Sequence, residues 1–219
     1  MKESRIQIVV LVTMAIACAN SSIAQVYNGD FSLGLNGWTL YLPPGSNPLG
    51  PDYQVASIDI DGSGPLSVSE AFHVNVGSDA LLDLQQGVFL TAGTTYNFFA
   101  NLAMTPPSDN ADGGTISVFV GPTGIASYSF GSTTVGVTEY ATISGTYQPA
   151  FTGAQTLSIN FSRGYGIGNG WQTPSDWIDN IELTPIPEPR TSVMEIAGLC
   201  ALAFVGSRKY SKSISPPAA

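Results

Sequence analysis

The sequence predicts an all-β domain that lies between two apolar terminal segments. From residue 25 to residue 184 the chain consists of short runs rich in β-branched and aromatic residues, interrupted by Gly, Pro, Asn and Asp. In TISVFVG and QTLSINFS, apolar and polar residues alternate, as in strands that bury one face. No stretch of this region has the apolar period of a helix. Together these observations predict a β-sandwich or barrel.

The first 24 residues have the form of a secretory signal peptide. Lys2 and Arg5 precede an apolar run, and small residues at positions 22 and 24 permit cleavage before Gln25. An alternative is processing at Cys18, because AIAC resembles a lipoprotein box. We favour cleavage before Gln25, which predicts an exported protein.

The region from Gln25 to Ile186 is strongly acidic. It contains one basic residue, Arg163, against thirteen acidic residues, which gives a formal charge of −12. Binding to a phosphate backbone requires clustered Lys and Arg, so this composition excludes nucleic acid as a partner. Both cysteines, Cys18 and Cys200, lie outside the region. A disulfide, a cysteine zinc site and a cysteine nucleophile are therefore excluded within it.

The strands are predicted where β-forming runs lie between turn signals. In chain order they are residues 26–32, 37–42, 53–60, 67–76, 80–85, 87–90, 94–104, 114–121, 125–130, 138–149, 155–162 and 176–183. The segments between them are rich in turn-forming residues, as in LPPGSNPLGP, MTPPSDNADGG and RGYGIGNGWQTPS.

Three motifs narrow the fold further. NGDFSLGLNGW, at residues 28–38, resembles the first-strand signature of galactose-binding-like jelly rolls, which include several carbohydrate-binding modules. LLDLQQGVFLTAGTTYNFFANLAM is similar to the Leu-x-Gln … Leu-x-x-Gly-x-x-Tyr hairpin of that family, and DWIDNIEL is similar to its closing strand. The motifs occur in the family's order and cover most of residues 25–184. The resemblance implies a single jelly-roll β-sandwich.

Residues 185–219 form a separate tail, in which a Pro-Glu-Pro triplet precedes a short apolar span and a basic group. This order resembles the PEP-CTERM sorting signal of some Gram-negative bacteria. The resemblance implies a short membrane helix, transient insertion into the inner membrane and an exosortase-type membrane protease as partner. It also implies a final location at the cell surface or in the extracellular, biofilm-type matrix. The sorting residues would be Pro187, Glu188, Pro189, Arg208 and Lys209.

The tail departs from that pattern in length. Its apolar span, residues 193–206, is shorter than the ~20 residues that usually cross a bilayer. The alternative interpretation is a proline-rich linker followed by an amphipathic terminal helix.

The segment DIDGSGPLSVSE matches a twelve-residue calcium loop. Oxygen-bearing side chains fall at positions 1, 3, 5, 9 and 12, the ninth being Ser67, and a glycine occupies the sharp turn at position 6. The principal ligand candidates are Asp59, Asp61, Ser63 and Glu70. Because both flanks are predicted strands, the alternative is a glycine-rich hairpin loop.

The family resemblance implies a second calcium site, where the first strand meets the last. The matching residues are Asp30 and Asp179, whereas Ser32 occupies the position of the usual family glutamate. The alternative is that both carboxylates only solvate strand ends. Calcium is the one cofactor that the sequence suggests.

Sugar recognition requires exposed aromatic rings, which stack on the C–H faces of a sugar, beside polar groups that bond its hydroxyls. Such residues gather in the glycine-rich loop RGYGIGNGWQTPSDW and follow the first Gly-Trp pair. The candidates are Tyr165, Trp171, Gln172, Trp177 and Tyr41. The alternative for each ring is packing within the domain.

No motif in the sequence supports catalysis. The single histidine, His73, lies in the alternating run AFHVNV, and neither a nucleophile elbow nor a zinc-binding helix motif is present. We therefore predict an exported, non-catalytic surface or matrix protein that binds exopolysaccharide. The alternatives are a structural or adhesive matrix protein without a sugar site, and a polysaccharide-cleaving enzyme.

Overall fold

The computed structural model describes residues 26–42, 53–64, 68–75, 81–106, 108–164 and 174–186. They belong to one compact unit that ends at Ile186. Within them the chain forms ten strands and no helix, and so no segment of this part meets the requirements of a membrane-crossing helix. The predicted signal peptide, residues 1–24, and the tail from Pro187 onward lie outside the described residues.

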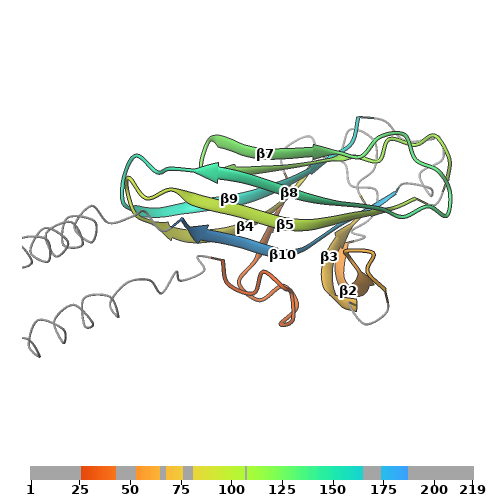
Figure 1. The fold of residues 1–219 in the computed structure, drawn as a ribbon, viewed down its shortest axis with the longest axis horizontal. Coiled ribbons are helices and arrows are strands. Elements are labelled where there is room, and N and C mark those ends of the chain that lie inside the picture. Colours follow the sequence, from red (N-terminus) through yellow and green to blue (C-terminus); the bar gives the residue numbers. More distant parts are fainter. Residues whose placement is uncertain are drawn as a thin grey trace, which may run out of the picture. The chain divides into compact units, whose positions relative to one another are not determined.

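The strands form two antiparallel sheets of five (Figure 1). Sheet A contains, in spatial order, β1 (Thr39–Tyr41), β4 (Leu81–Leu90), β9 (Gly153–Ser162), β6 (Thr115–Val120) and β7 (Thr123–Ser129). Sheet B contains β2 (Tyr53–Asp59), β3 (Val68–Val74), β10 (Ser175–Pro185), β5 (Tyr96–Thr105) and β8 (Glu139–Tyr147).

Strands β3 to β10 pair in the order of a jelly roll. β6 and β7 form a hairpin, and outward from it β5 pairs with β8, β4 with β9, and β3 with β10. The chain is therefore one long antiparallel ribbon that alternates between the two sheets, as in the double Greek key of this fold. β1 and β2 add one edge strand to each sheet. The prediction of an all-β sandwich is confirmed.

The hydrophobic core lies between the sheets. Alternate residues of β4, β9 and β6 point into it, and Leu84, Ile159 and Val118 are fully buried there. Phe98 and Ile178 meet them from sheet B. Full burial of each such side chain contributes on the order of 2 kcal/mol. The alternation in the sequence therefore fixes which residues remain on the outer face of each sheet.

Residues 26–32, which were predicted as a strand, form a turn instead. Asn28 and Phe31 have positive φ angles of 52° and 50°, which strands do not adopt. The Asn28 side chain makes three hydrogen bonds to backbone groups of residues 33–36 and so closes the loop. Phe31 and Trp38 project from this loop into the core, with ring centroids 5.7 Å apart. The motif that predicted a strand therefore forms a turn whose two aromatic side chains, Phe31 and Trp38, pack into the core.

The other predicted strands lie within a few residues of the observed ones, with one merger. Residues 80–85 and 87–90 belong to a single strand, β4. Gln86, the residue between the two predicted strands, continues the strand and pairs with Leu157 of β9. Gly87 beside it pairs with Thr156 and interrupts neither the ladder nor the alternation.

Candidate functional site

The outer face of sheet A carries polar side chains in rows that cross the strands. Because Leu84, Ile159 and Val118 point into the core, their neighbours along β4, β9 and β6 point outward. The strand register then places these neighbours side by side. Two rows run from β4 across β9 to β6, namely Asp83–Asn160–Ser117 and Gln85–Ser158–Phe119.

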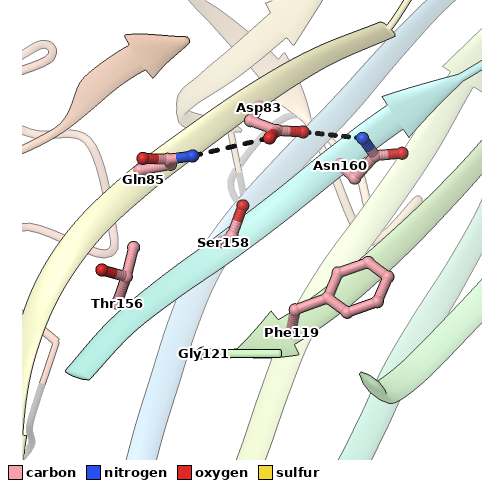
Figure 2. A pocket seen from close by; sticks show the side chains of 7 residues that line it. All are labelled: Asp83, Gln85, Phe119, Gly121, Thr156, Ser158 and Asn160. Atoms are coloured by element: carbon pink, nitrogen blue, oxygen red, sulfur yellow. Dashed lines mark hydrogen bonds between the residues drawn. The ribbon is translucent and has the colours of Figure 1, made fainter. Parts of the chain in front are cut away.

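An open hollow of about 430 Å³ lies on this face (Figure 2). A hollow of this size falls within the range of small-ligand sites. Its lining consists of polar side chains, one glycine and one aromatic ring: Asp83, Gln85, Phe119, Gly121, Thr156, Ser158 and Asn160.

A carboxylate held between two amides forms the polar part of the hollow. Asn160 Nδ2 donates to Asp83 Oδ1 at 2.6 Å, and Gln85 Nε2 makes a longer contact of 3.5 Å with Asp83 Oδ2. The hydroxyl groups of Thr156 and Ser158 line the hollow beside them (Figure 2). Carboxylate, amide and hydroxyl groups together offer the donors and acceptors that a ligand rich in hydroxyls requires.

Two aromatic rings border this polar group on opposite sides. Tyr41, on the edge strand β1, pairs with Asp83, and its side chain is 47% exposed. Phe119 lies across β9, on β6, and is half-buried. A sugar ring could stack on either aromatic face while its hydroxyls reach the residues between them.

Of the other residues predicted to bind sugar, Trp177 is the one that the described part of the chain includes. Tyr165, Trp171 and Gln172 lie outside the described residues. Trp177 is on β10 of sheet B, whereas Tyr41 is on β1 of sheet A.

Trp177 and its neighbour His73 make packing contacts. Trp177 Nε1 donates to Thr105 Oγ1 at 3.0 Å, and its ring lies 4.2 Å from the imidazole of His73, centroid to centroid. Trp177 is partly buried in a small apolar cluster separate from the main core. His73 is buried in β3, as expected of a strand histidine.

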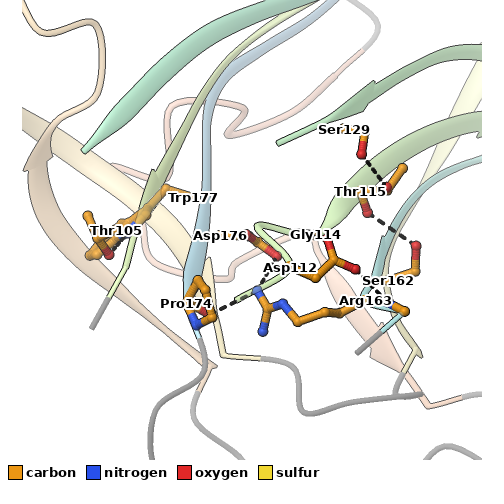
Figure 3. Close-up of polar contacts among 11 residues, drawn as sticks. Thr105, Asp112, Gly114, Thr115, Ser129, Ser162, Arg163, Pro174, Asp176 and Trp177 are labelled. Carbon is orange, nitrogen blue, oxygen red and sulfur yellow. Dashed lines mark hydrogen bonds and ion pairs between the residues drawn. The ribbon is translucent and has the colours of Figure 1, made fainter. Parts of the chain in front are cut away.

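A buried ion pair joins the two strands that flank the glycine-rich loop (Figure 3). Arg163 follows β9, and its Nη2 lies 3.0 Å from Oδ2 of Asp176 on β10, with both side chains fully buried. The same nitrogen donates to the Pro174 carbonyl at 2.9 Å. The pKa of Asp176 is raised to about 7, because the effect of burial, to which the nearby charge of Asp112 adds, outweighs the lowering by Arg163. These contacts tie Arg163, at the end of β9, to Pro174 and Asp176, at the start of β10.

In the segment matched to a calcium loop, the carboxylates make local contacts. Asp59 and Asp61 each accept a hydrogen bond of 2.9 Å from backbone N–H groups of residues 63–64. Glu70 lies within β3 and accepts a hydrogen bond of 2.7 Å from Ser57 Oγ on β2. These contacts favour the interpretation as a hairpin loop.

The second predicted calcium position lies around Asp179. Asp179 Oδ2 accepts a hydrogen bond of 2.6 Å from Ser69 Oγ, whereas Oδ1 is buried without a hydrogen-bond partner. Burial raises the pKa of Asp179 to about 6. The hydrogen bond from Ser69 lowers this pKa, and the negative charges of Asp30 and Glu70 raise it.

This environment suits a hard cation in part. A buried carboxylate oxygen without a partner, close to two further carboxylates, is a donor that Ca²⁺ prefers. Among the described residues, however, no group of three His, Cys, Asp or Glu is placed to hold a metal ion. A calcium ion at Asp179 would therefore draw much of its coordination from backbone carbonyls and water.

Part of the signal for the hollow is present in the sequence. In LLDLQQGVFL and QTLSINFS the alternation assigns Asp83, Gln85, Ser158 and Asn160 to the outward face of their strands. What the sequence could not supply was the register, which sets Asp83 opposite Asn160.

Comparisons with known proteins find structural neighbours but no family. No family model matches the sequence, and no curated protein matches it. Among solved structures, the chain is similar to the enzymatically active domain of tailspike protein 4 of bacteriophage CBA120. The identity is 17% over 75% of this chain and 22% of that chain, with a TM-score of 0.46. This chain therefore spans only a small part of the tailspike.

Two carbohydrate-binding modules with a β-sandwich fold are also among the neighbours. TmCBM61 in complex with β-1,4-galactotriose is 16% identical over 75% of this chain and 100% of that chain, with a TM-score of 0.43. The CBM22-1 xylan-binding domain of Paenibacillus barcinonensis Xyn10C is 9% identical over 78% of this chain and 99% of that chain, with a TM-score of 0.43.

Proposed function

We propose that this protein is an exported, non-catalytic polysaccharide-binding protein whose sugar site is the outer face of sheet A. The observation that supports this proposal is the hollow around Asp83, with Tyr41 and Phe119 on its two sides. Sugar chains are recognised by stacking on aromatic rings and by hydrogen bonds to their hydroxyls. This face offers both kinds of contact within one surface.

The charge of the face favours an uncharged polysaccharide. Asp83 is the one charged residue that lines the hollow in the described part of the chain, and it is negative. Arg163 is the only basic residue between positions 25 and 186, and its side chain is buried in the ion pair with Asp176. A uronate or sulfate polymer would therefore meet repulsion with no cation to offset it. A neutral hexose or pentose polymer is the proposed ligand.

The single carboxylate of the described lining supports the proposal of binding without cleavage. Glycosidases commonly work with two carboxyl groups, about 5 Å or about 6.5–9.5 Å apart. Asp83 has no second acid beside it in the described lining of the hollow. We therefore place this protein with binding proteins rather than with hydrolases.

Export and sorting are proposed from the order of segments along the chain. A signal-peptide-like start precedes the sandwich, and a tail resembling a PEP-CTERM signal, residues 185–219, follows it. The basic residues behind the apolar span would hold its end on the cytoplasmic side. An exosortase-type protease is the proposed partner, and the cell surface or extracellular matrix is the proposed destination.

Removal of Tyr41 or Asp83 is expected to weaken glycan binding. We expect Tyr41→Ala and Asp83→Ala each to raise the Kd about tenfold, the effect of losing one principal contact worth ~1.4 kcal/mol. A glycan array first identifies the neutral polysaccharide, and calorimetric titration then compares the variants.

Tyr140→Ala is the matched control. Tyr140 lies on β8 of sheet B and is 44% exposed, against 47% for Tyr41. We expect its affinity to equal that of the unchanged protein. An equal loss at Tyr41 and Tyr140 would remove sheet A as the site. A folded protein that binds no neutral polysaccharide would favour the structural or adhesive matrix protein.

We also propose a structural calcium ion at Asp179, with Asp30 close by. At a calcium concentration about a hundredfold above Kd, binding adds ~2.7 kcal/mol, or roughly 5–10 °C in Tm for a domain of this size. Asp179→Asn should abolish this gain. Without calcium at pH 7 the variant should be no less stable, because it lacks a carboxylate whose pKa burial raises to about 6.

Thermal unfolding with calcium or with a chelator measures this effect. Glu182→Gln, which removes an exposed carboxylate from the same strand, should keep the full response to calcium. If Asp179→Asn responds as strongly as the unchanged protein, the ion is not held at Asp179.

A further inference from the structure

At one end of the sandwich, the residues that follow β10 lie beside two loops, the β4–β5 and β8–β9 connections. Two backbone N–H groups of the β4–β5 connection, residues 91–95, donate to acceptors in the β8–β9 connection, residues 148–152, at 3.1 and 2.9 Å. Ile186, which follows β10, donates its N–H to the Thr95 carbonyl at 2.7 Å. In Figure 1 the arrow of β10 points toward this end. We call residues 89–96, 147–153 and 184–186 the exit end.

The exit end exposes two phenylalanine rings. Phe89 is 60% exposed and Phe151 is 61% exposed, the highest values among the large hydrophobic side chains of the described residues. Phe89 points away from the core, because its neighbours Val88 and Leu90 are buried in it. A phenylalanine ring has no polar atom that could hydrogen-bond with water. Together with Ile186, which is 41% exposed, the two rings gather apolar surface at one end of the domain, and such clustering is typical of contact with an apolar partner.

The exit end carries no charge, although the domain is acidic. Residues 89–96, 147–153 and 184–186 contain no Asp, Glu, Lys, Arg or His. The opposite end, formed by the β5–β6 and β7–β8 connections, contains Asp109 and Asp112. An anionic surface would therefore repel the opposite end and tolerate the exit end.

The chain runs from this end toward its apolar tail. Only six residues separate Ile186 from Val193, where the apolar span begins. Even fully extended, they reach at most about 20–25 Å. If the span enters a bilayer, the domain is held within that distance of the lipid surface.

We propose that the exit end is a membrane-contacting surface and that Phe89 and Phe151 insert into the interfacial layer of a lipid bilayer. This proposal rests on the proposed function, in which the tail inserts into the inner membrane. Apolar side chains gain free energy at that depth, and no charge at the exit end opposes their entry. The strands would then run away from the membrane. Phe89 shares the outer face of sheet A with the hollow, but Asp83 lies six residues away along β4, about 20 Å from it, so the polar part of the hollow would stay open to polysaccharide.

The test is the depth of single added tryptophans in the full-length chain. The protein is reconstituted into vesicles of phosphatidylethanolamine and phosphatidylglycerol, with or without brominated lipid. Phe89→Trp and Phe151→Trp are compared with Val137→Trp, which lies in the β7–β8 connection at the opposite end and is 50% exposed in the unchanged protein. Unchanged thermal melting confirms that each variant is folded. We expect the fluorescence added at positions 89 and 151 to be blue-shifted and quenched by brominated lipid, and that at 137 to be neither.

The outcomes separate this proposal from the one on which it rests. If the chain floats with the vesicles but positions 89 and 151 behave as position 137 does, the membrane-contacting surface is overturned and the tail anchor stands. A blue shift without quenching would mean that a second copy or the chain's own tail covers the rings, which also overturns it. If the chain does not float, the tail anchor fails, and the membrane-contacting surface fails with it.

Discussion

Arg163→Met is expected to destabilise the domain by about 3–5 kcal/mol, the usual penalty for leaving one member of a buried ion pair alone. The remaining carboxylate of Asp176 would stay fully buried, and its Oδ1 already lacks a hydrogen-bond partner. Methionine fills a volume similar to that of arginine and brings no charge. The loss would therefore report the unpaired charge, together with the hydrogen bond to the Pro174 carbonyl, rather than a cavity.

A second substitution should restore much of this loss. In Arg163→Met/Asp176→Asn neither partner is charged, and buried pairs replaced in this way are often neutral in stability. Urea unfolding of the unchanged protein, both single variants and the double variant completes the cycle. Single costs that simply add in the double variant would show that the two side chains do not stabilise each other.

The effect of Arg163→Met should depend on pH in a defined direction. Burial holds the pKa of Asp176 at about 7, above its ordinary value of 3.8, so the folded state keeps its proton to a higher pH than the unfolded chain does. Stability from this group therefore falls as pH rises from about 4 to 7. Without Arg163 the pKa rises further, and the variant should lose more stability at pH 8 than at pH 5.

The fold could be predicted from the sequence because its signals are local. Alternation in TISVFVG and QTLSINFS assigns each side chain to one face of its strand, whatever the strand's partners are. The hollow could not be predicted in the same way. Asp83 and Asn160 are 77 positions apart in the chain, and only the pairing of β4 with β9 brings them together. Register of this kind is set by long-range packing.

The surroundings of Trp177 illustrate a further limit of sequence proximity. Trp177 was grouped with the glycine-rich loop that precedes it, and the structure adds that it belongs to β10, where it alternates with the core residue Ile178. The alternation of side chains along β10 determines what surrounds Trp177, and distance along the chain does not. At residues 26–32 the prediction of a strand followed the apolar and aromatic residues. The Asn28-Gly29 pair, which is a turn signal, indicates the structure that is observed.

The second large effect is expected at Gly29, in the same motif. A Cβ atom there would lie 2.1 Å from the carbonyl oxygen of Ile181, which is backbone of β10. Neither segment can move apart freely, because the Ile181 N–H donates to the Gly29 carbonyl at 2.9 Å. Gly29→Ala should therefore cost about 3 kcal/mol or more, at or beyond the top of the usual range for overpacking.

Gly87→Ala is the matched control, because nothing lies within 4 Å of a Cβ at that position on β4. Its loss of unfolded-state freedom should instead stabilise the domain by about 0.4–1 kcal/mol. Thermal unfolding of the two variants side by side measures the difference. If the stability of Gly29→Ala equals that of Gly87→Ala, the loop formed by residues 26–38 does not pack on β10. The closeness of Asp30 to Asp179 would then lose its basis, and with it the calcium ion proposed between them.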